Sequence, residues 1–187
     1  MGVGRLCIML MLLGPVVSNA SPITYDVNRT VGAGSVTGTI QTDGTLGILS
    51  TGNITDWNLL LSDGTNTFHL TGPLSGNDSA VLIQGADVSA TATQLLYDFD
   101  GSASFLLFQQ GLFSGNHYYC DASSTFVCFE GESVVPLSIF DPGAIHFPRE
   151  GSQVIGTVSD GGPVPEPGTL ALLGLGLAGL RFTRRKR

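Results

Sequence analysis

Three Asp-Gly pairs divide the central part of this chain, and each lies between short segments in which apolar and polar residues alternate. The pairs are Asp43-Gly44, Asp63-Gly64 and Asp100-Gly101. Asp-Gly tolerates the positive φ angles of a type I′ turn, whose twist matches that of two paired strands. We therefore expect three β-hairpins. They would join Ser35–Thr42 to Thr45–Leu49, Trp57–Ser62 to Thr65–Thr71, and Leu95–Phe99 to Ala103–Phe108.

Alternation with a period of two residues predicts strands elsewhere in this region as well. In the segment SVTGTIQT, Val36, Gly38 and Ile40 fall on one face and the polar residues on the other; in TQLLYDF, the shared face carries Leu95, Tyr97 and Phe99. No window of about a dozen residues gives an amphipathic helix. Further strands are expected at Ile23–Val31, Ala80–Gln84, Val88–Ala92, His117–Cys120, Phe126–Glu130, Val134–Phe140 and Gln153–Val158.

Many short strands separated by glycine-rich turns predict an all-β domain over residues 21–158. The expected architecture is an antiparallel β-sandwich of the jelly-roll kind. A domain of roughly 140 residues buries about two-thirds of the surface of its unfolded chain, which is enough for a proper core. We expect that core to contain Trp57, the Phe residues and Leu59–Leu61.

The first twenty residues have the three parts of a secretory signal peptide. Arg5 supplies a positive charge, Leu6–Val17 is an apolar run, and Ser18-Asn19-Ala20 places small residues at the −3 and −1 positions of a cleavage site. We expect residues 1–20 to form a signal helix that is cleaved after Ala20. The alternative is an uncleaved N-terminal anchor.

The other end of the chain combines a linker, a short apolar run and a basic cluster. Residues 159–168 are rich in Gly and Pro, which oppose both helices and strands and predict a linker. The apolar run Thr169–Leu180 would form a helix of about 18 Å, shorter than a hydrocarbon core of about 30 Å. The basic residues after it would hold the chain on the cytoplasmic side; they are Arg181, Arg184, Arg185, Lys186 and Arg187. Residues 169–187 are thus expected to form a short transmembrane segment with a basic cytoplasmic tail.

The end of the chain reads Val164-Pro165-Glu166-Pro167-Gly168, then the run TLALLGLGLAGL and then the ending RFTRRKR. This arrangement resembles the PEP-CTERM sorting signal of Gram-negative bacteria. It implies that exosortase, a membrane protease, recognises Pro165, Glu166 and Pro167 and processes a precursor tethered to the inner membrane. It also implies a destination at the cell surface or in the exopolysaccharide matrix. The alternative is a single-pass anchor that is never cleaved.

A longer central segment, GSVTGTIQTDGTLGILSTGNITDWNLLL, is also similar to a recurrent passenger type found with this signal. That passenger type has no characterised function, so the resemblance supplies no active site.

Between the two ends the chain is strongly acidic. Residues 21–168 contain Arg29 and Arg149 as their only basic residues, against all fifteen Asp and Glu residues, a formal charge of −13. Such a surface repels phosphate backbones, so we expect no nucleic-acid partner. It suits an extracytoplasmic protein, and it could attract divalent cations, cationic polymers or polyhydroxyl polymers such as extracellular polysaccharide. The alternative is a solvated acidic surface with no such partner.

Two cysteines remain once a signal peptide is removed, Cys120 and Cys128. In an oxidising compartment, this spacing predicts a disulfide that closes a small loop. A zinc site with help from His117 is the alternative, but two cysteines without a second close pair make a poor zinc site.

No known catalytic motif appears in the sequence, and we expect neither an enzyme nor a cofactor. The three histidines, His69, His117 and His146, fall in separate predicted strands or loops. Asp98, Asp100 and Gly101 resemble a fragment of a calcium loop that Ser102 and Ser104 would have to continue. The acidic residues that could pair as acid and base in a hydrolase are Asp141, Glu130, Glu132 and Glu150.

These observations predict an exported, non-enzymatic β-domain with a structural or adhesive role. A lectin-like module is the second hypothesis, with Tyr118, Tyr119 and Asp121 as candidate sugar contacts. A secreted hydrolase is the third.

Overall fold

The structure is a computed structural model that describes residues 21–111, 117–125, 128–136 and 145–158. These residues form two β-sheets and one short 3₁₀ helix. The elements are β1 (Ile23–Val31), β2 (Gly34–Thr42), β3 (Gly47–Ile48), η1 (Thr51–Asn53), β4 (Ile54–Ser62), β5 (Thr67–Thr71), β6 (Ala80–Gln84), β7 (Val88–Ala90), β8 (Gln94–Asp98), β9 (Phe105–Gln109), β10 (Tyr118–Ala122), β11 (Gly131–Val135), β12 (Ile145–Phe147) and β13 (Ser152–Val158).

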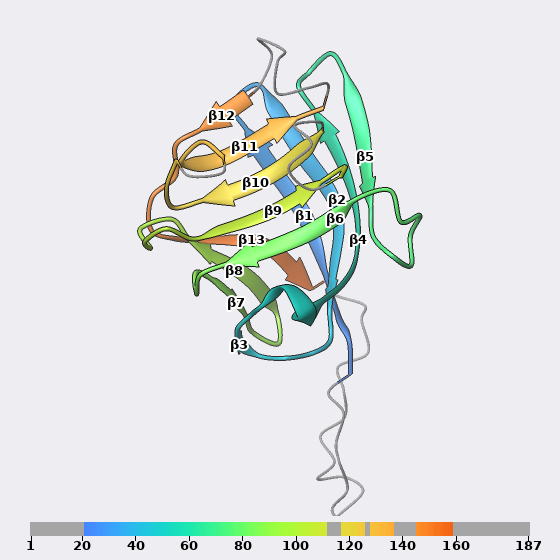
Figure 1. Ribbon diagram of the computed structural model, residues 1–187, viewed down its shortest axis with the longest axis vertical. Helices are drawn as coiled ribbons and strands as arrows, with labels where there is room; N and C mark the ends of the chain where they lie inside the picture. The colour runs from blue at the N-terminus through green and yellow to red at the C-terminus, as the bar shows by residue number, and fades with distance from the viewer. Residues whose placement is uncertain (1–20, 112–116, 126–127, 137–144, 159–187) are drawn as a thin grey trace, which may run out of the picture.

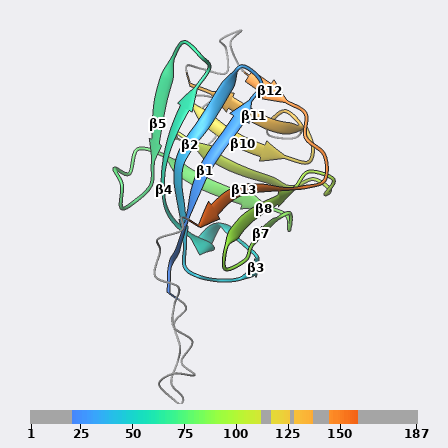
Figure 2. The ribbon, with the colours of Figure 1, turned by 180° about the vertical axis from the view of Figure 1, so that it is seen from behind.

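The larger sheet has eight strands in the order β3-β7-β8-β13-β1-β2-β4-β5, and the smaller sheet has five in the order β12-β11-β10-β9-β6. Neighbouring strands are antiparallel in both sheets. The smaller sheet lies in front of the larger one, and its strands cross the direction of β1, β2 and β4 (Figures 1 and 2). The all-β prediction is therefore confirmed, with two antiparallel sheets in a sandwich-like arrangement.

The jelly-roll topology is not confirmed. Strands β1, β2, β4 and β5 follow one another as a meander in the larger sheet, and β9 to β12 do the same in the smaller one. A jelly roll is instead defined by two Greek keys spread over two sheets.

One of the three predicted Asp-Gly hairpins is confirmed and two are wrong. Strands β4 and β5 pair around Asp63, which accepts hydrogen bonds from the backbone N–H groups of Thr65 (2.8 Å) and Asn66 (2.6 Å). Strand β2 does not pair with the segment after Asp43, because β1 and β4 occupy both of its edges. That segment instead forms β3, which pairs with β7.

At the third Asp-Gly pair, Asp100-Gly101, the chain passes from the larger sheet to the smaller one and forms no hairpin. Strand β8 pairs with β7 and β13 in the larger sheet, whereas β9 pairs with β6 and β10 in the smaller one. Residues 99–104 therefore cross from one sheet to the other. Asp-Gly sets a local bend, but the partner of each strand depends on which edges are free.

Most other strands lie near their predicted positions. Strands β1 and β6 have the predicted bounds. The strand expected at Phe126–Glu130 is wrong for the described residues 128–130, because the strand β11 begins only at Gly131. Part of the strand expected at Val134–Phe140 lies outside the described residues, and β12 was not predicted because it has only three residues.

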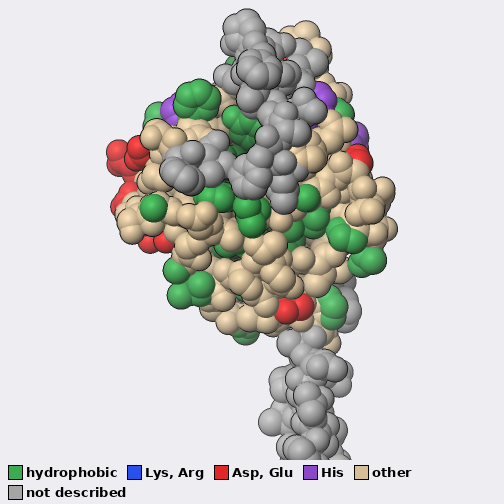
Figure 3. Space-filling view, viewed as in Figure 1, with side chains coloured by type: hydrophobic (Ala, Val, Ile, Leu, Met, Phe, Trp, Pro, Cys, Tyr) green, Lys and Arg blue, Asp and Glu red, His purple; other side chains and the backbone are tan. Residues whose placement is uncertain are grey.

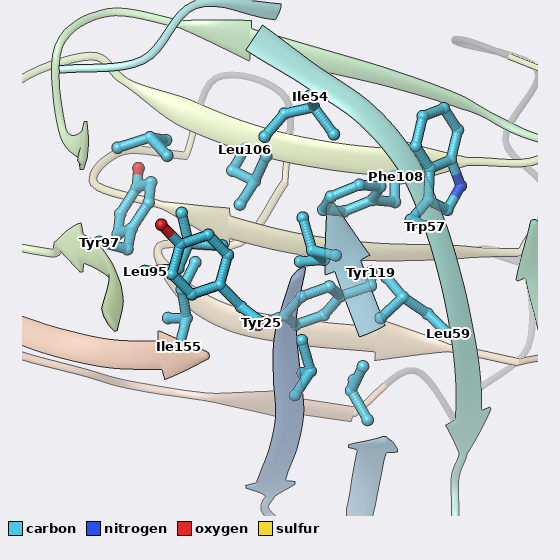
Figure 4. Packing of buried hydrophobic residues seen from close by; sticks show 14 of the residues in the cluster. Tyr25, Ile54, Trp57, Leu59, Leu95, Tyr97, Leu106, Phe108, Tyr119 and Ile155 are labelled. Atoms are coloured by element: carbon cyan, nitrogen blue, oxygen red, sulfur yellow. The ribbon is translucent and has the colours of Figure 1, made fainter. Parts of the chain in front are cut away.

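The main core lies between the two sheets (Figure 4). Trp57 contacts Phe108 at 5.5 Å between ring centroids and donates a hydrogen bond from Nε1 to Ser79 Oγ (2.8 Å). Leu59 and Leu61 are fully buried as predicted, but Leu60 is only half-buried, because alternate residues of β4 point to the outer face. Of the Phe residues expected in the core, Phe129 and Phe147 are exposed.

Candidate functional site

A cluster of charged and hydroxyl side chains lies buried within this sandwich. Arg29 comes from β1 of the larger sheet, Tyr119 and Asp121 come from β10, and Glu132 comes from β11 of the smaller sheet. Arg149 reaches the cluster from the connection between β12 and β13. We call these five residues the buried charge cluster.

Strand alternation explains why these polar residues point inward. Arg29 lies on the same side of β1 as the buried Tyr25, Val27 and Val31. In the smaller sheet, Asp121 and Glu132 face each other as partners in the β10–β11 ladder. The pairing of β10 with β11 therefore sets two carboxyl groups side by side on the inner face.

Glu132 accepts hydrogen bonds on both carboxylate oxygens. Arg29 approaches side-on, from Nε to Oε1 and from Nη2 to Oε2, both at 3.0 Å. Arg149 donates to Oε2 at 2.9 Å, and the hydroxyl of Tyr119 lies 3.0 Å from Oε1. Glu132 is fully buried, so its negative charge is compensated entirely within the protein. The only two basic residues of the acidic region 21–168 thus bind one carboxylate.

The two arginines also donate hydrogen bonds to backbone carbonyl groups of the larger sheet. Arg29 donates from Nη1 to the carbonyl oxygen of Val154 in β13 (2.8 Å). Arg149 donates from Nη2 to the carbonyl oxygen of Thr30 in β1 (2.6 Å), and its guanidinium lies 4.6 Å from the centre of the Phe147 ring. Burial alone would lower the pKa of Arg29, but its hydrogen bonds to Glu132 and the charge of Glu132 outweigh burial and raise it.

The hydroxyl of Tyr119 lies between the two carboxyl groups of the cluster. Its hydroxyl oxygen lies 3.0 Å from Asp121 Oδ2 and 3.0 Å from Glu132 Oε1, yet a hydroxyl has a single hydrogen to donate. If Asp121 carries a proton, it can donate to Tyr119, and Tyr119 can donate to Glu132. Burial, reinforced by the Glu132 carboxylate, raises the pKa of Asp121 well above its usual range. Burial and the two neighbouring carboxyl groups likewise raise the pKa of Tyr119.

The surroundings of Asp121 also favour its neutral form. Among the described residues, its other oxygen, Oδ1, has no hydrogen-bond partner. An ionised carboxylate with one bare, buried oxygen is unfavourable, whereas a neutral carboxyl group tolerates it better. Burial, the nearby Glu132 carboxylate and the unpartnered Oδ1 therefore all favour the protonated form of Asp121.

This cluster can join the two sheets, but it is closed to a substrate. Asp121, Tyr119 and Glu132 are each fully buried. Within the described ranges, no three His, Cys, Asp or Glu side chains come together as a metal site. The cluster therefore links the larger sheet to the smaller one through the ion pair of Arg29 with Glu132.

The three residues predicted as sugar contacts do not lie on the surface. Tyr119 and Asp121 are fully buried and Tyr118 is 7% exposed, so the prediction for these residues is wrong. Tyr118 belongs to a second apolar cluster with Phe105 and Leu107, on the outer face of the smaller sheet. Strand β10 is buried on both faces, and alternation could not reveal this.

The histidines and carboxylates considered for catalysis are not assembled into one site. His69 is exposed on β5, while His117 stacks on Phe68 with ring centroids 3.6 Å apart. His146 lies beside Phe129 and contacts the carbonyl oxygen of Glu130.

Among the candidate hydrolase carboxylates, Glu132 is taken up by the buried charge cluster. Glu130 and Glu150 are exposed, and Asp141 lies outside the described residues.

The residues considered for calcium serve as turn contacts. Asp98 accepts a hydrogen bond from the N–H of Asp100 (3.2 Å), and Asp100 accepts one from the N–H of Gly151 (2.8 Å). Both carboxylates therefore hold the crossing between the two sheets in place.

The predicted disulfide is confirmed between Cys120 and Cys128, whose Cα atoms are 6.5 Å apart. Both residues are buried beside Phe105 and Leu107 in the outer cluster of the smaller sheet. The bridge therefore anchors the segment after β10 to that sheet. The pairing leaves neither thiolate free for the alternative zinc site.

The remaining predicted site residues lie outside the described residues. They are the cleavage position Ala20, the motif Pro165, Glu166 and Pro167, and the basic residues Arg181, Arg184, Arg185, Lys186 and Arg187. The signal helix and the short C-terminal helix lie there as well and stay predictions. In the part of the chain that the structure describes, no helix has the length and apolar character needed to cross a membrane.

The outer face of β1, β2, β4 and β5, the strands seen from behind in Figure 2, carries mostly small polar side chains. The ladder pairs place these side chains in three rows, each of which crosses all four strands. The rows are Thr30-Ser35-Ser62-Thr67, Asn28-Thr37-Leu60-His69 and Asp26-Thr39-Asn58-Thr71. All of these residues are exposed or half-buried, and Asp26 is the only acidic one among them.

Comparison with known proteins bears on the end of the chain. Residues 163–187 match the family model of the PEP-CTERM protein-sorting motif. No curated protein and no solved structure matches the chain. The match confirms the predicted sorting signal and supports an exported, membrane-anchored precursor that exosortase processes.

Proposed function

We propose that this PEP-CTERM protein delivers a non-enzymatic β-domain to the cell surface or the exopolysaccharide matrix, where the domain has a structural or adhesive role. In this proposal, residues 169–187 hold the precursor at the inner membrane, and exosortase recognises Pro165, Glu166 and Pro167. The processed domain then leaves the membrane.

The observation that carries the non-enzymatic role is the closure of the buried charge cluster. Catalytic acids and bases need contact with substrate, and groups with perturbed pKa values are the first candidates in an uncharacterised protein. Here Asp121 and Tyr119 have such values, but neither is exposed. Both carboxylate oxygens of Glu132 are held by Arg29, Arg149 and Tyr119. This arrangement supports a role in stability.

Sorting is tested by mass spectrometry of the mature protein from cells with a working exosortase. We expect the mature chain to end near the motif. Replacing Pro165, Glu166 and Pro167 together with Ala should leave the full-length chain in the membrane fraction. The change Pro163→Ala, in the same linker but outside the motif, should be processed normally. Recovery of intact Arg187 in the mature wild-type protein would overturn the processing step.

The destination is tested by fractionating the cells and their matrix. The mature domain should be found in the outer-surface or matrix fraction, and the triple Ala variant should be depleted from it. A mature domain found only as free protein in the medium would refute the structural or adhesive role.

Binding of a neutral polysaccharide is the second candidate, and the outer face of β1, β2, β4 and β5 favours it. Its hydroxyl and amide groups can donate and accept hydrogen bonds, and β-branched Thr side chains are stiff at χ1, so little rotamer freedom is lost on binding. This face is nearly uncharged although the region 21–168 has a formal charge of −13. A largely polar face with little charge is suited to an uncharged chain of sugars.

Co-sedimentation of the mature protein with the host polysaccharide, with and without calcium, tests this candidate. Thr37→Asp places a charge at the middle of this face and should weaken binding. Thr93→Asp makes the same change in the exposed turn between β7 and β8 and should leave binding unchanged. Equal binding by both variants would rule out this face as the binding surface.

A further inference from the structure

The chain enters and leaves the domain at one end. At this end Ile23 pairs with Thr42, and Tyr25 pairs with Val158, the last described residue. The turn between β7 and β8 lies there too, because Thr93 accepts a hydrogen bond from the N–H of Val158 (2.9 Å). We call this region the tail-proximal end; it comprises residues 21–23, 43–53, 91–94 and 158. It is at the lower end of the domain in Figures 1 and 2, beside β3.

Two aliphatic side chains project from the tail-proximal end. Leu46 is 56% exposed and Ile48 is 65% exposed, whereas Leu49 turns inward and is 2% exposed. The segment that carries them is held in place. Strand β3 pairs with β7, and the N–H of Asp43 donates to the carbonyl oxygen of Asn53 (2.9 Å). The two side chains are therefore presented on an ordered support, which lowers the entropic cost of using them in a contact.

The tail-proximal end is also poor in charge. Asp43 is its only ionisable side chain, and its two carboxylate oxygens already accept hydrogen bonds from the N–H of Thr45 (2.8 Å) and from Asn53 Nδ2 (3.0 Å). The turn at residues 91–94 contains only Thr, Ala and Gln. Other faces of the domain carry acidic side chains, some of them visible in Figure 3. An anionic lipid surface would therefore repel this end less than the rest of the domain.

We propose that the tail-proximal end lies against the bilayer in the tethered precursor, with Leu46 and Ile48 in the lipid interface. This inference rests on the tethered precursor of the proposed function. Residues 159–168 connect Val158 to the apolar run that begins at Thr169, and ten residues span at most about 35 Å. The end from which this linker leaves is thus held within reach of the lipid surface.

The linker to the membrane segment explains how the small contact of Leu46 and Ile48 with lipid can form, and cleavage of that linker explains how the contact ends. Two aliphatic side chains alone bind a membrane only weakly, but a tether makes their contact intramolecular and raises its effective concentration. Cleavage at the sorting motif removes the tether. The weak contact then no longer retains the domain, which is released without any change in its fold.

Lipid photolabelling tests the contact directly. The full-length precursor is reconstituted into vesicles of phosphatidylethanolamine and phosphatidylglycerol that contain a lipid with a diazirine near its headgroup. After irradiation, labelled peptides are identified by mass spectrometry. We expect domain labelling at residues 43–53. The double variant Leu46→Ser, Ile48→Ser should lower that labelling about tenfold, as expected for the loss of two partly buried aliphatic contacts.

The matched control is Leu74→Ser. Leu74 is 76% exposed in the connection between β5 and β6 and lies outside the tail-proximal end. Its replacement should leave labelling of residues 43–53 unchanged. Circular dichroism confirms that each variant is folded, which is expected because all three residues are exposed.

The outcomes separate this inference from the proposed function. If the precursor floats with the vesicles but residues 43–53 are unlabelled, or if the double variant is labelled as strongly as wild type, the membrane-facing end is refuted and sorting is unaffected. If the precursor does not float with the vesicles, both the tether and this inference are refuted.

Discussion

Replacing Glu132 with Gln removes the negative charge that Arg29 and Arg149 share while keeping the size of the side chain. The new amide group would place N–H donors against guanidinium donors. The side chains of Arg29 and Arg149 are only 13% and 20% exposed, so neither charge is well solvated. Removal of one partner from a buried ion pair costs about 3–5 kcal/mol. Because both arginines keep some contact with water, we expect Glu132→Gln to lower the free energy of unfolding by about 3 kcal/mol.

For Asp121, the carboxyl group next to Glu132, we expect the corresponding amide substitution not to destabilise the protein. If Asp121 is protonated, Asp121→Asn replaces one neutral group with another of nearly the same shape. The Asn amide can donate to Tyr119 in place of the carboxyl proton. We therefore expect Asp121→Asn to change the free energy of unfolding by less than about 1 kcal/mol below about pH 4, where the unfolded chain is protonated too, and to be more stable than wild type at pH 7.

Urea denaturation followed by the fluorescence of Trp57 measures these changes. Trp57 is the only tryptophan of the chain and is 4% exposed, so its emission reports on loss of the core. Glu130→Gln is the matched control, because Glu130 is exposed and such surface changes cost less than about 0.5 kcal/mol. The reasoning is refuted if Glu132→Gln behaves like Glu130→Gln, or if Asp121→Asn is as damaging as Glu132→Gln.

The pH dependence of the same measurement tests the proton on Asp121. Its pKa is raised in the folded state, so above about pH 4 the folded chain keeps a proton that the unfolded chain has released. The contribution of this group to stability is therefore full at low pH and declines as pH rises toward the raised pKa. The difference in stability between wild type and Asp121→Asn should shift in favour of the variant over that range. A difference that does not vary with pH would mean that Asp121 has an ordinary pKa.

Three further changes test the contacts around this cluster and in the sheets. Tyr119→Phe removes the hydroxyl that bridges both carboxyl groups and should lower the free energy of unfolding by about 1–3 kcal/mol in urea titrations; a smaller loss would mean that the bridge is not used. Cys120→Ser opens the disulfide and should cost about 2–3 kcal/mol, with dithiothreitol destabilising wild type but not the variant. Gly38→Ala should cost at least about 2 kcal/mol, because φ is +131° and a Cβ would meet the carbonyl oxygen of Asn58 at 1.9 Å, whereas Gly52→Ala has open space and should be tolerated in thermal melts.

Much of the local structure could be predicted because it depends on the period of a strand. Alternate residues of a strand point to opposite faces, so the pattern of β1 places Tyr25, Val27 and Val31 together on the inner face. The same pattern places Arg29 there, and this was a usable sign that a basic residue is buried. The short loop between Cys120 and Cys128 was equally predictable, because it closes within a few residues.

Strand partners could not be predicted in the same way, because they depend on contacts between distant parts of the chain. Asp43-Gly44 and Asp63-Gly64 carry the same turn signal, yet only the second makes the predicted hairpin. The difference is that β1 and β4 already occupy both edges of β2.

The buried charge cluster shows the same division. Arg29 and Glu132 are 103 residues apart, and the facing of β1 against β11 across the sandwich brings them together. The sorting signal is contiguous and legible in the printed residues. The partner of Arg29 and Arg149 could be identified only from the packed sheets. Burial of an arginine creates the need for a counter-charge, and the topology decides which residue supplies it.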